Sequence, residues 1–153
     1  MDATFLVIGI GNTLRRDDGA GWLFAQALAD ALRNAGTAVE LILQQQLMPE
    51  TAEIVAEQGA AQVVFVDASI ETETVTIEMV RDKSASFSAS HHVAPATILA
   101  VAHRLYGAEA AGWLVQIPAR DLGHGEGLSE HTAACLDEAD AIAANLLAQT
   151  MRR

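Results

Sequence analysis

Four short apolar runs, separated by stretches in which apolar residues recur every three or four positions, organise this sequence of 153 residues. The runs have the length and the bulky side chains of buried strands, and they cover residues 4–9, 38–44, 62–69 and 113–118. The stretches with helical spacing cover residues 18–34, 49–59, 95–107 and 129–147. Strands that alternate with helices are typical of an open, mainly parallel sheet with helices on both faces. The pattern predicts an α/β fold, a three-layer α/β/α sandwich around a mostly parallel, mixed and twisted sheet of about five strands.

A further strand is predicted within residues 72–81, where Val75, Ile77 and Met79 alternate with polar neighbours. Such alternation is typical of a strand with one exposed face. We therefore expect this segment near an edge of the sheet, where an antiparallel orientation is also open to it.

The composition limits the classes of protein to which the chain can belong. Because 51% of its residues are hydrophobic, we expect one compact domain over residues 1–153. The formal charge of −11 repels nucleic acids and anionic membranes, so neither is an expected partner. A single cysteine, Cys135, cannot form an internal disulfide, and we expect it to pack inside a helix. With no signal segment and no apolar run of about 18–20 residues, a soluble cytoplasmic protein is expected.

The most informative motif is the glycine-rich stretch GIGNTLRRDDGAG at residues 9–21. A dinucleotide-binding loop of the form G-x-G-x-x-G would need a third glycine where Leu14 stands. Asp17 and Asp18 would repel a phosphate at the start of the following helix. Carboxylates on a flexible backbone instead favour a cation, although Asp17 could simply stabilise the helix N-terminus.

Two further polar positions follow predicted strands. Asp67 ends the third apolar run, and His91 and His92 precede the helix that Pro95 begins. In open α/β sheets, ligands bind beyond the carboxyl ends of the strands. Asp67 could alternatively cap a turn, and the histidines could lie at the surface. Two carboxylates and an imidazole would together suit a borderline divalent metal.

The opening motif resembles that of the hydrogenase maturation endopeptidases, which process the large subunit of nickel-iron hydrogenases. The family pattern, a strand followed by G-x-G-N-x-L-x-x-D-[DE]-G-x-G, is matched without a break from Gly9 to Gly21, and the likeness extends over nearly the whole chain. Family members bind metal through an acidic residue, an aspartate and a histidine. The resemblance implies Asp18, Asp67 and His91 as the metal ligands and catalytic residues here, with His91 favoured over His92.

The resemblance also implies a reaction and a partner. It implies an endopeptidase that removes a C-terminal extension from a nickel-iron hydrogenase large-subunit precursor after nickel insertion, and that acts as a monomer. The nickel would be supplied by the substrate, and other divalent metals could replace it in vitro. The absence of an H-E-x-x-H zinc signature agrees with this reading. Two alternatives are a nickel-checking chaperone that does not cleave and a nucleotide- or metal-binding sensor domain.

Overall fold

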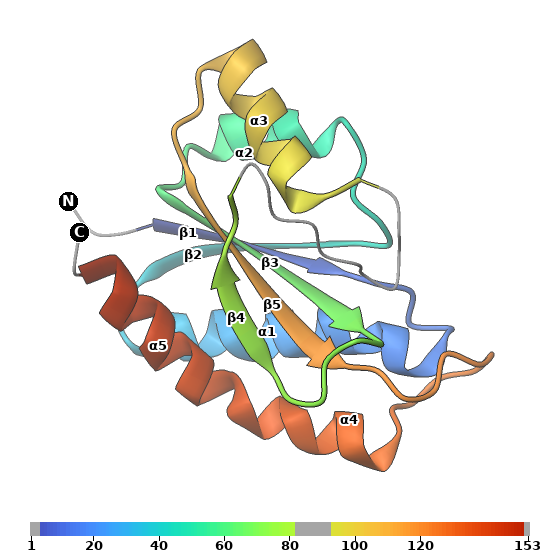
Figure 1. Ribbon diagram of the computed structural model, residues 1–153. Helices are drawn as coiled ribbons and strands as arrows, with labels where there is room; N and C mark the ends of the chain where they lie inside the picture. The colour runs from blue at the N-terminus through green and yellow to red at the C-terminus, as the bar shows by residue number, and fades with distance from the viewer. Residues whose placement is uncertain (1–3, 82–92, 152–153) are drawn as a thin grey trace.

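The structure, a computed structural model, describes residues 4–81 and 93–151. Its centre is a five-stranded sheet with the order β2-β1-β3-β5-β4 (Figure 1). The strands are β1 (Thr4–Ile10), β2 (Ala38–Gln44), β3 (Gln62–Ser69), β4 (Thr76–Met79) and β5 (Ala111–Pro118). β1 pairs in parallel with β2 and β3, and β3 pairs in parallel with β5. β4 lies at the edge, antiparallel to β5, which confirms the expected edge strand and the mixed sheet.

Helices cover both faces of the sheet, as predicted. They are the 3₁₀ turn η1 (Arg16–Gly19), α1 (Ala20–Asn34), α2 (Thr51–Gln58), α3 (Pro95–Tyr106), α4 (Glu130–Cys135), the 3₁₀ turn η2 (Leu136–Glu138) and α5 (Ala139–Met151). Figure 1 shows α1, α4 and α5 on one face and α2 and α3 on the other. None of the helices in the described residues is both long and apolar enough to cross a membrane.

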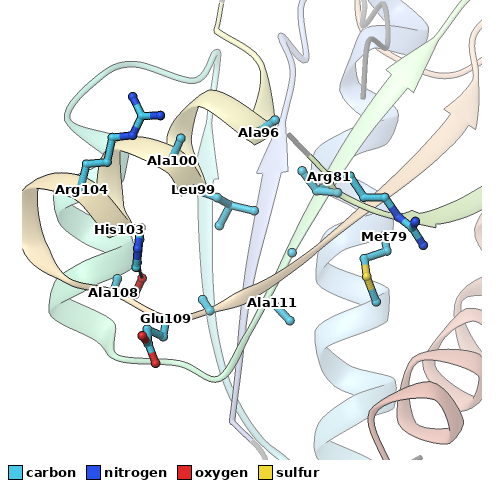
Figure 2. Close-up of a pocket in the computed structure, with 13 residues that line it drawn as sticks. Met79, Arg81, Ala96, Leu99, Ala100, His103, Arg104, Ala108, Glu109 and Ala111 are labelled. Carbon is cyan, nitrogen blue, oxygen red and sulfur yellow. Dashed lines mark hydrogen bonds between the residues drawn. The ribbon is translucent and has the colours of Figure 1, made fainter. Parts of the chain in front are cut away.

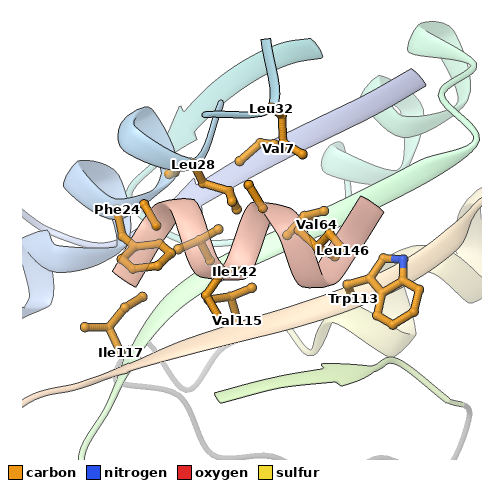
Figure 3. Packing of buried hydrophobic residues seen from close by; sticks show 14 of the residues in the cluster. Val7, Phe24, Leu28, Leu32, Val64, Trp113, Val115, Ile117, Ile142 and Leu146 are labelled. Atoms are coloured by element: carbon orange, nitrogen blue, oxygen red, sulfur yellow. The ribbon is translucent and has the colours of Figure 1, made fainter. Parts of the chain in front are cut away.

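Alternate residues of the strands contribute to two hydrophobic cores because successive side chains point to opposite faces of a sheet. Val7, Val64 and Val115 face α1 and α5, where Figure 3 shows Phe24, Leu28, Leu32, Ile142 and Leu146 packed around them. Leu6, Ile8, Val63 and Phe65 face the opposite core, which includes Val55 of α2 and Ile98 of α3. Both faces of β1 and β3 are thus buried, which explains their continuous apolar sequences.

Two helix predictions differ from the structure. The helix predicted over 49–59 begins at Thr51. Pro49 instead lies in a turn in which the Thr51 amide donates to the Met48 carbonyl at 2.9 Å and the Met48 amide donates to Thr51 Oγ1 at 3.1 Å. The last helical stretch is not continuous, because η2 separates α4 from α5. Cys135 is buried at the end of α4, as expected.

Candidate functional site

Asp18 and Asp67 come from neighbouring strands at the same edge of the sheet. Gly9 of β1 pairs with Val66 of β3, so Asp67 follows directly beside the end of β1. The chain leaving β1 enters η1, which carries Asp18 and lies against β3. The two carboxylates expected from the sequence therefore lie at the carboxyl edge, where open α/β sheets bind ligands.

Glycines allow the chain that follows β1 to fold back closely against the end of that strand. A Cβ atom on Gly11 would lie 1.9 Å from the carbonyl oxygen of Asp18, and a Cβ atom on Gly21 would lie 2.0 Å from the carbonyl oxygen of Ile10. Both approaches are closer than any side chain permits. The glycines of the motif thus bring the backbone of η1 and the start of α1 against the end of β1.

Asp18 is the more unusual of the two acids. Its side chain is buried, and its Oδ2 accepts a hydrogen bond from the Asn12 amide at 2.9 Å. Its Oδ1 is also buried and has no hydrogen-bond partner among the described residues. Burial raises the pKa of Asp18, although the Asn12 amide and the Arg15 charge act in the opposite direction. A buried carboxylate oxygen without a partner is costly, and a bound cation would offset that cost.

Asp67 is also buried, with an exposed fraction of 1%. Its Oδ1 accepts a hydrogen bond from the amide of Ala68 at 2.9 Å. In the sheet Asp67 pairs with Gln116 of β5, so it lies within a strand rather than in a surface turn. This buried position does not support the alternative in which Asp67 caps an exposed turn.

Asp17, which adjoins Asp18, has a different role from its neighbour. Its carboxylate accepts hydrogen bonds of 2.7–2.8 Å from the amides of Arg120, Asp121 and Ser129 and from the Ser129 hydroxyl. The Thr132 hydroxyl lies 3.0 Å from the same carboxylate. Burial acts to raise the pKa of Asp17, but the hydrogen bonds from Ser129, Arg120 and Asp121 outweigh it and lower the pKa below its ordinary value. Asp17 therefore binds the segment after β5, including Ser129 and Thr132 at the start of α4, in addition to lying in the first turn of η1.

Backbone contacts join the same two segments. The Gly125 amide donates to the Leu14 carbonyl, the Arg16 amide donates to the Gly125 carbonyl, and the Asp17 amide donates to the Asp121 carbonyl, each at 2.9 Å. Arg16 also forms an ion pair of 2.9 Å with Asp121. These contacts hold η1 against the segment after β5. They were not predicted from the sequence, in which the glycine-rich composition of residues 120–129 was the available signal.

The predicted imidazole ligand is not tested by the structure. His91 and His92 both lie outside the described residues. In the part of the chain that is described, no group of three or more His, Cys, Asp or Glu side chains is positioned to hold a metal ion. Asp18 and Asp67 are thus the two candidate oxygen ligands in the described residues, and the whole ligand set stays a prediction.

A hollow also lies at the opposite end of the strands. It has a volume of about 400 Å³ and lies between α3 and the ends of β4 and β5 where Met79 and Gly112 stand (Figure 2). Figure 2 shows the guanidinium groups of Arg81 and Arg104 pointing away from each other. Without converging polar groups, this hollow is a weaker candidate site than the two buried acids.

Solved structures provide the comparisons with known proteins. No family model and no curated protein sequence matches this chain. The [NiFe] hydrogenase maturation protease HycI from Thermococcus kodakarensis KOD1 is similar, with a TM-score of 0.62 and 26% identity over 99% of this chain and 94% of that chain. HybD from Thermococcus kodakarensis has a TM-score of 0.63 and 22% identity over 94% and 98% of the two chains. HybD from E. coli has a TM-score of 0.63 and 18% identity over 96% and 93%. The chain thus shares its fold with these hydrogenase maturation proteases over nearly its full length, and the identity to HycI together with the opening motif supports membership of their family.

Proposed function

We propose that this protein is an endopeptidase that removes the C-terminal extension of a nickel-iron hydrogenase large-subunit precursor after nickel insertion. The observation that carries the proposal is the buried Asp18, one of whose carboxylate oxygens has no hydrogen-bond partner in the described part of the chain, at the same sheet edge as the buried Asp67. The shared fold with the HycI and HybD proteases supports the peptidase activity. The protein would act as a cytoplasmic monomer on this one partner.

Asp18 and Asp67 would bind the nickel that the precursor carries, with His91 as the third ligand. The Oδ1 atom of Asp18 is oriented by the contacts of Oδ2 and is shielded from water, so its attraction to a cation is weakened little by solvent. Binding the nickel at this point would hold the adjoining peptide in one position, and such positioning accounts for a large share of many rate enhancements. The nickel would also polarise the peptide carbonyl or a water molecule.

Water is the proposed nucleophile, because the candidate side chains are engaged elsewhere. The Cys135 thiol is buried, burial raises its pKa, and its Sγ donates to the carbonyl of His131 at 3.3 Å. The Ser129 hydroxyl donates to Asp17 at 2.7 Å, with no histidine between them. Neither arrangement yields an activated nucleophile. One of the two site aspartates would then accept the proton of the attacking water.

The geometry disfavours the nucleotide-sensor alternative. Nucleotide-binding loops hold phosphates with free backbone amides. Here the Gly11 amide donates to the Gln44 carbonyl at 3.0 Å, the Asn12 amide donates to Asp18, and the Leu14 amide donates to the Asn12 side chain at 2.9 Å. These amides are not available to an anion. The non-cleaving chaperone would bind the same precursor and leave it intact, so the cleavage assay below distinguishes it from the protease.

The test is cleavage of a hydrogenase large-subunit precursor with and without nickel, followed by mass spectrometry. We expect loss of a C-terminal peptide only from the nickel-loaded precursor, and at least about a hundredfold slower cleavage with Asp18→Asn and Asp67→Asn. Asp30→Asn is the matched control, because Asp30 is an exposed acid on α1 that pairs with Arg33 at 3.6 Å.

Three outcomes contradict parts of the proposal. Binding of the loaded precursor without cleavage would support the chaperone. Equal cleavage of loaded and nickel-free precursor would refute nickel recognition. Full activity of Asp18→Asn and Asp67→Asn would refute the site.

A further inference from the structure

Two adjacent arginines, Arg15 and Arg16, directly precede Asp17 and Asp18, and each arginine has a different partner in the structure. Arg16 pairs with Asp121 on the segment after β5. The Nη1 atom of Arg15 lies 3.9 Å from Oδ2 of Asp18, and the Arg15 side chain is 40% exposed. The site acid therefore has a positive charge beside it, on a side chain that solvent can reach.

The backbone holds Arg15 in this position. Its amide donates to the Asn12 carbonyl, and its carbonyl accepts from the Asp18 amide, each at 3.0 Å. Arg15 also forms a bridge with Gly125. The two side chains lie three residues apart at a 3₁₀ turn, where such positions are eclipsed. The Arg15 backbone is thus fixed where its guanidinium can lie beside Oδ2 of Asp18, while Oδ1 has no hydrogen-bond partner among the described residues.

We propose that Arg15 determines which form of metal the site accepts, by opposing free divalent cations more strongly than metal presented by a protein substrate. The repulsion depends on the net charge of the incoming group. A hydrated divalent ion carries two positive charges, whereas anionic protein ligands cancel much of that charge. Arg15 would thereby keep the site from filling with free metal, and select metal that arrives on the substrate. This inference rests on the proposed function, because it assumes that the precursor carries the nickel to the site.

Isothermal titration of the protein with nickel chloride tests the inference directly. Arg15→Gln should bind Ni²⁺ roughly three- to tenfold more tightly than the wild type, a modest factor because the guanidinium is partly exposed and screened. Arg15→Lys, which keeps the charge, should bind like the wild type. Arg33→Gln, a surface control on α1 that pairs with Asp30, measures the effect of removing any one positive charge. Adding Asp18→Asn to Arg15→Gln should abolish the gain.

The inference is refuted if Arg15→Gln binds Ni²⁺ no more tightly than the wild type or Arg33→Gln, or if the gain survives Asp18→Asn. A lack of measurable Ni²⁺ binding by both the wild type and Arg15→Gln refutes it as well. Circular dichroism and thermal unfolding establish that each variant is folded. Precursor cleavage is measured separately: failure of the wild type to cleave refutes the proposed function, whereas the Ni²⁺ affinities alone decide the role of Arg15.

Discussion

Replacing Asp17 by Asn should strongly destabilise the fold, because no amide can satisfy the donors around this carboxylate. Oδ2 accepts from Arg120, Asp121 and the Ser129 hydroxyl, and Oδ1 accepts from the Ser129 amide. With the amide oxygen at the Oδ2 position, three hydrogen bonds lose their charged acceptor, which costs about 1 kcal/mol each. The NH₂ group then faces the Ser129 amide, and the unsatisfied donor costs about 1–3 kcal/mol more.

We therefore expect Asp17→Asn to lower the free energy of unfolding by about 4–6 kcal/mol, a large part of the roughly 5–15 kcal/mol of a typical domain. Urea denaturation followed by circular dichroism measures this difference. Asp30→Asn is the control: the Asp30 side chain is 74% exposed, and its loss should change stability by less than about 0.5 kcal/mol. A change below about 1 kcal/mol for Asp17→Asn would show that the carboxylate does not hold the two segments together.

The same contacts predict a dependence on pH. The hydrogen bonds lower the pKa of Asp17 in the folded state below its ordinary value of 3.8, despite the opposing effect of burial. A lowered folded-state pKa contributes stability that is present above the unfolded-state pKa and is lost as the pH falls through the folded-state pKa. The difference in stability between the wild type and Asp17→Asn should thus be constant near neutral pH and shrink below about pH 4. A difference that grows on acidification would contradict the assigned direction.

Three other variants test separate features. Asp18→Asn should lose precursor processing yet raise the free energy of unfolding at pH 7 by about 1 kcal/mol, because burial raises the pKa of Asp18 and penalises its charge. Urea denaturation measures the change in stability, and a lower stability of the variant would contradict the prediction. Gly21→Ala should lower the free energy of unfolding by about 3 kcal/mol or more, or yield insoluble protein, because the alanine Cβ would lie 2.0 Å from the Ile10 carbonyl oxygen. A melting temperature equal to that of the wild type would refute the close packing at Gly21. Trp113→Phe should lower the free energy of unfolding, measured by urea denaturation, by about 2–3 kcal/mol, because the indole donates a hydrogen bond to the buried Gln62 side chain at 2.8 Å. A change below about 1 kcal/mol would show that this hydrogen bond adds little stability.

The sequence was sufficient to predict the sheet and the edge of it at which Asp18 and Asp67 lie. β1 and β3 are buried on both faces, so their apolar runs are unbroken and easily recognised. The placement of the two acids followed because Asp18 comes after β1 and Asp67 lies near the end of β3, and parallel strands end at one edge. These inferences use only local pattern and one general rule of topology.

The role of Asp17 could not be predicted in the same way. Its partners Arg120, Asp121 and Ser129 are 103 to 112 positions away, and no local pattern links residues so far apart. The sequence left open a role at the N-terminus of the following helix, and Asp17 does lie in the first turn of η1, but its hydrogen bonds to the segment after β5 had no local signal. Whether His91 completes the site stays a prediction, since it lies outside the described residues.

The long separation between η1 and its partners also has a consequence for synthesis of the chain. The segment with Asp17 leaves the ribosome more than a hundred residues before Ser129, whose amide and hydroxyl bind it. Until then the Asp17 carboxylate has none of those donors, and the turn that carries Asp18 is held only from the β1 side. Contacts between residues so distant in sequence form late in folding, because closing a long loop is costly in entropy. The candidate site should therefore become ordered only when the last helices dock, so a nascent or truncated chain would present no competent site.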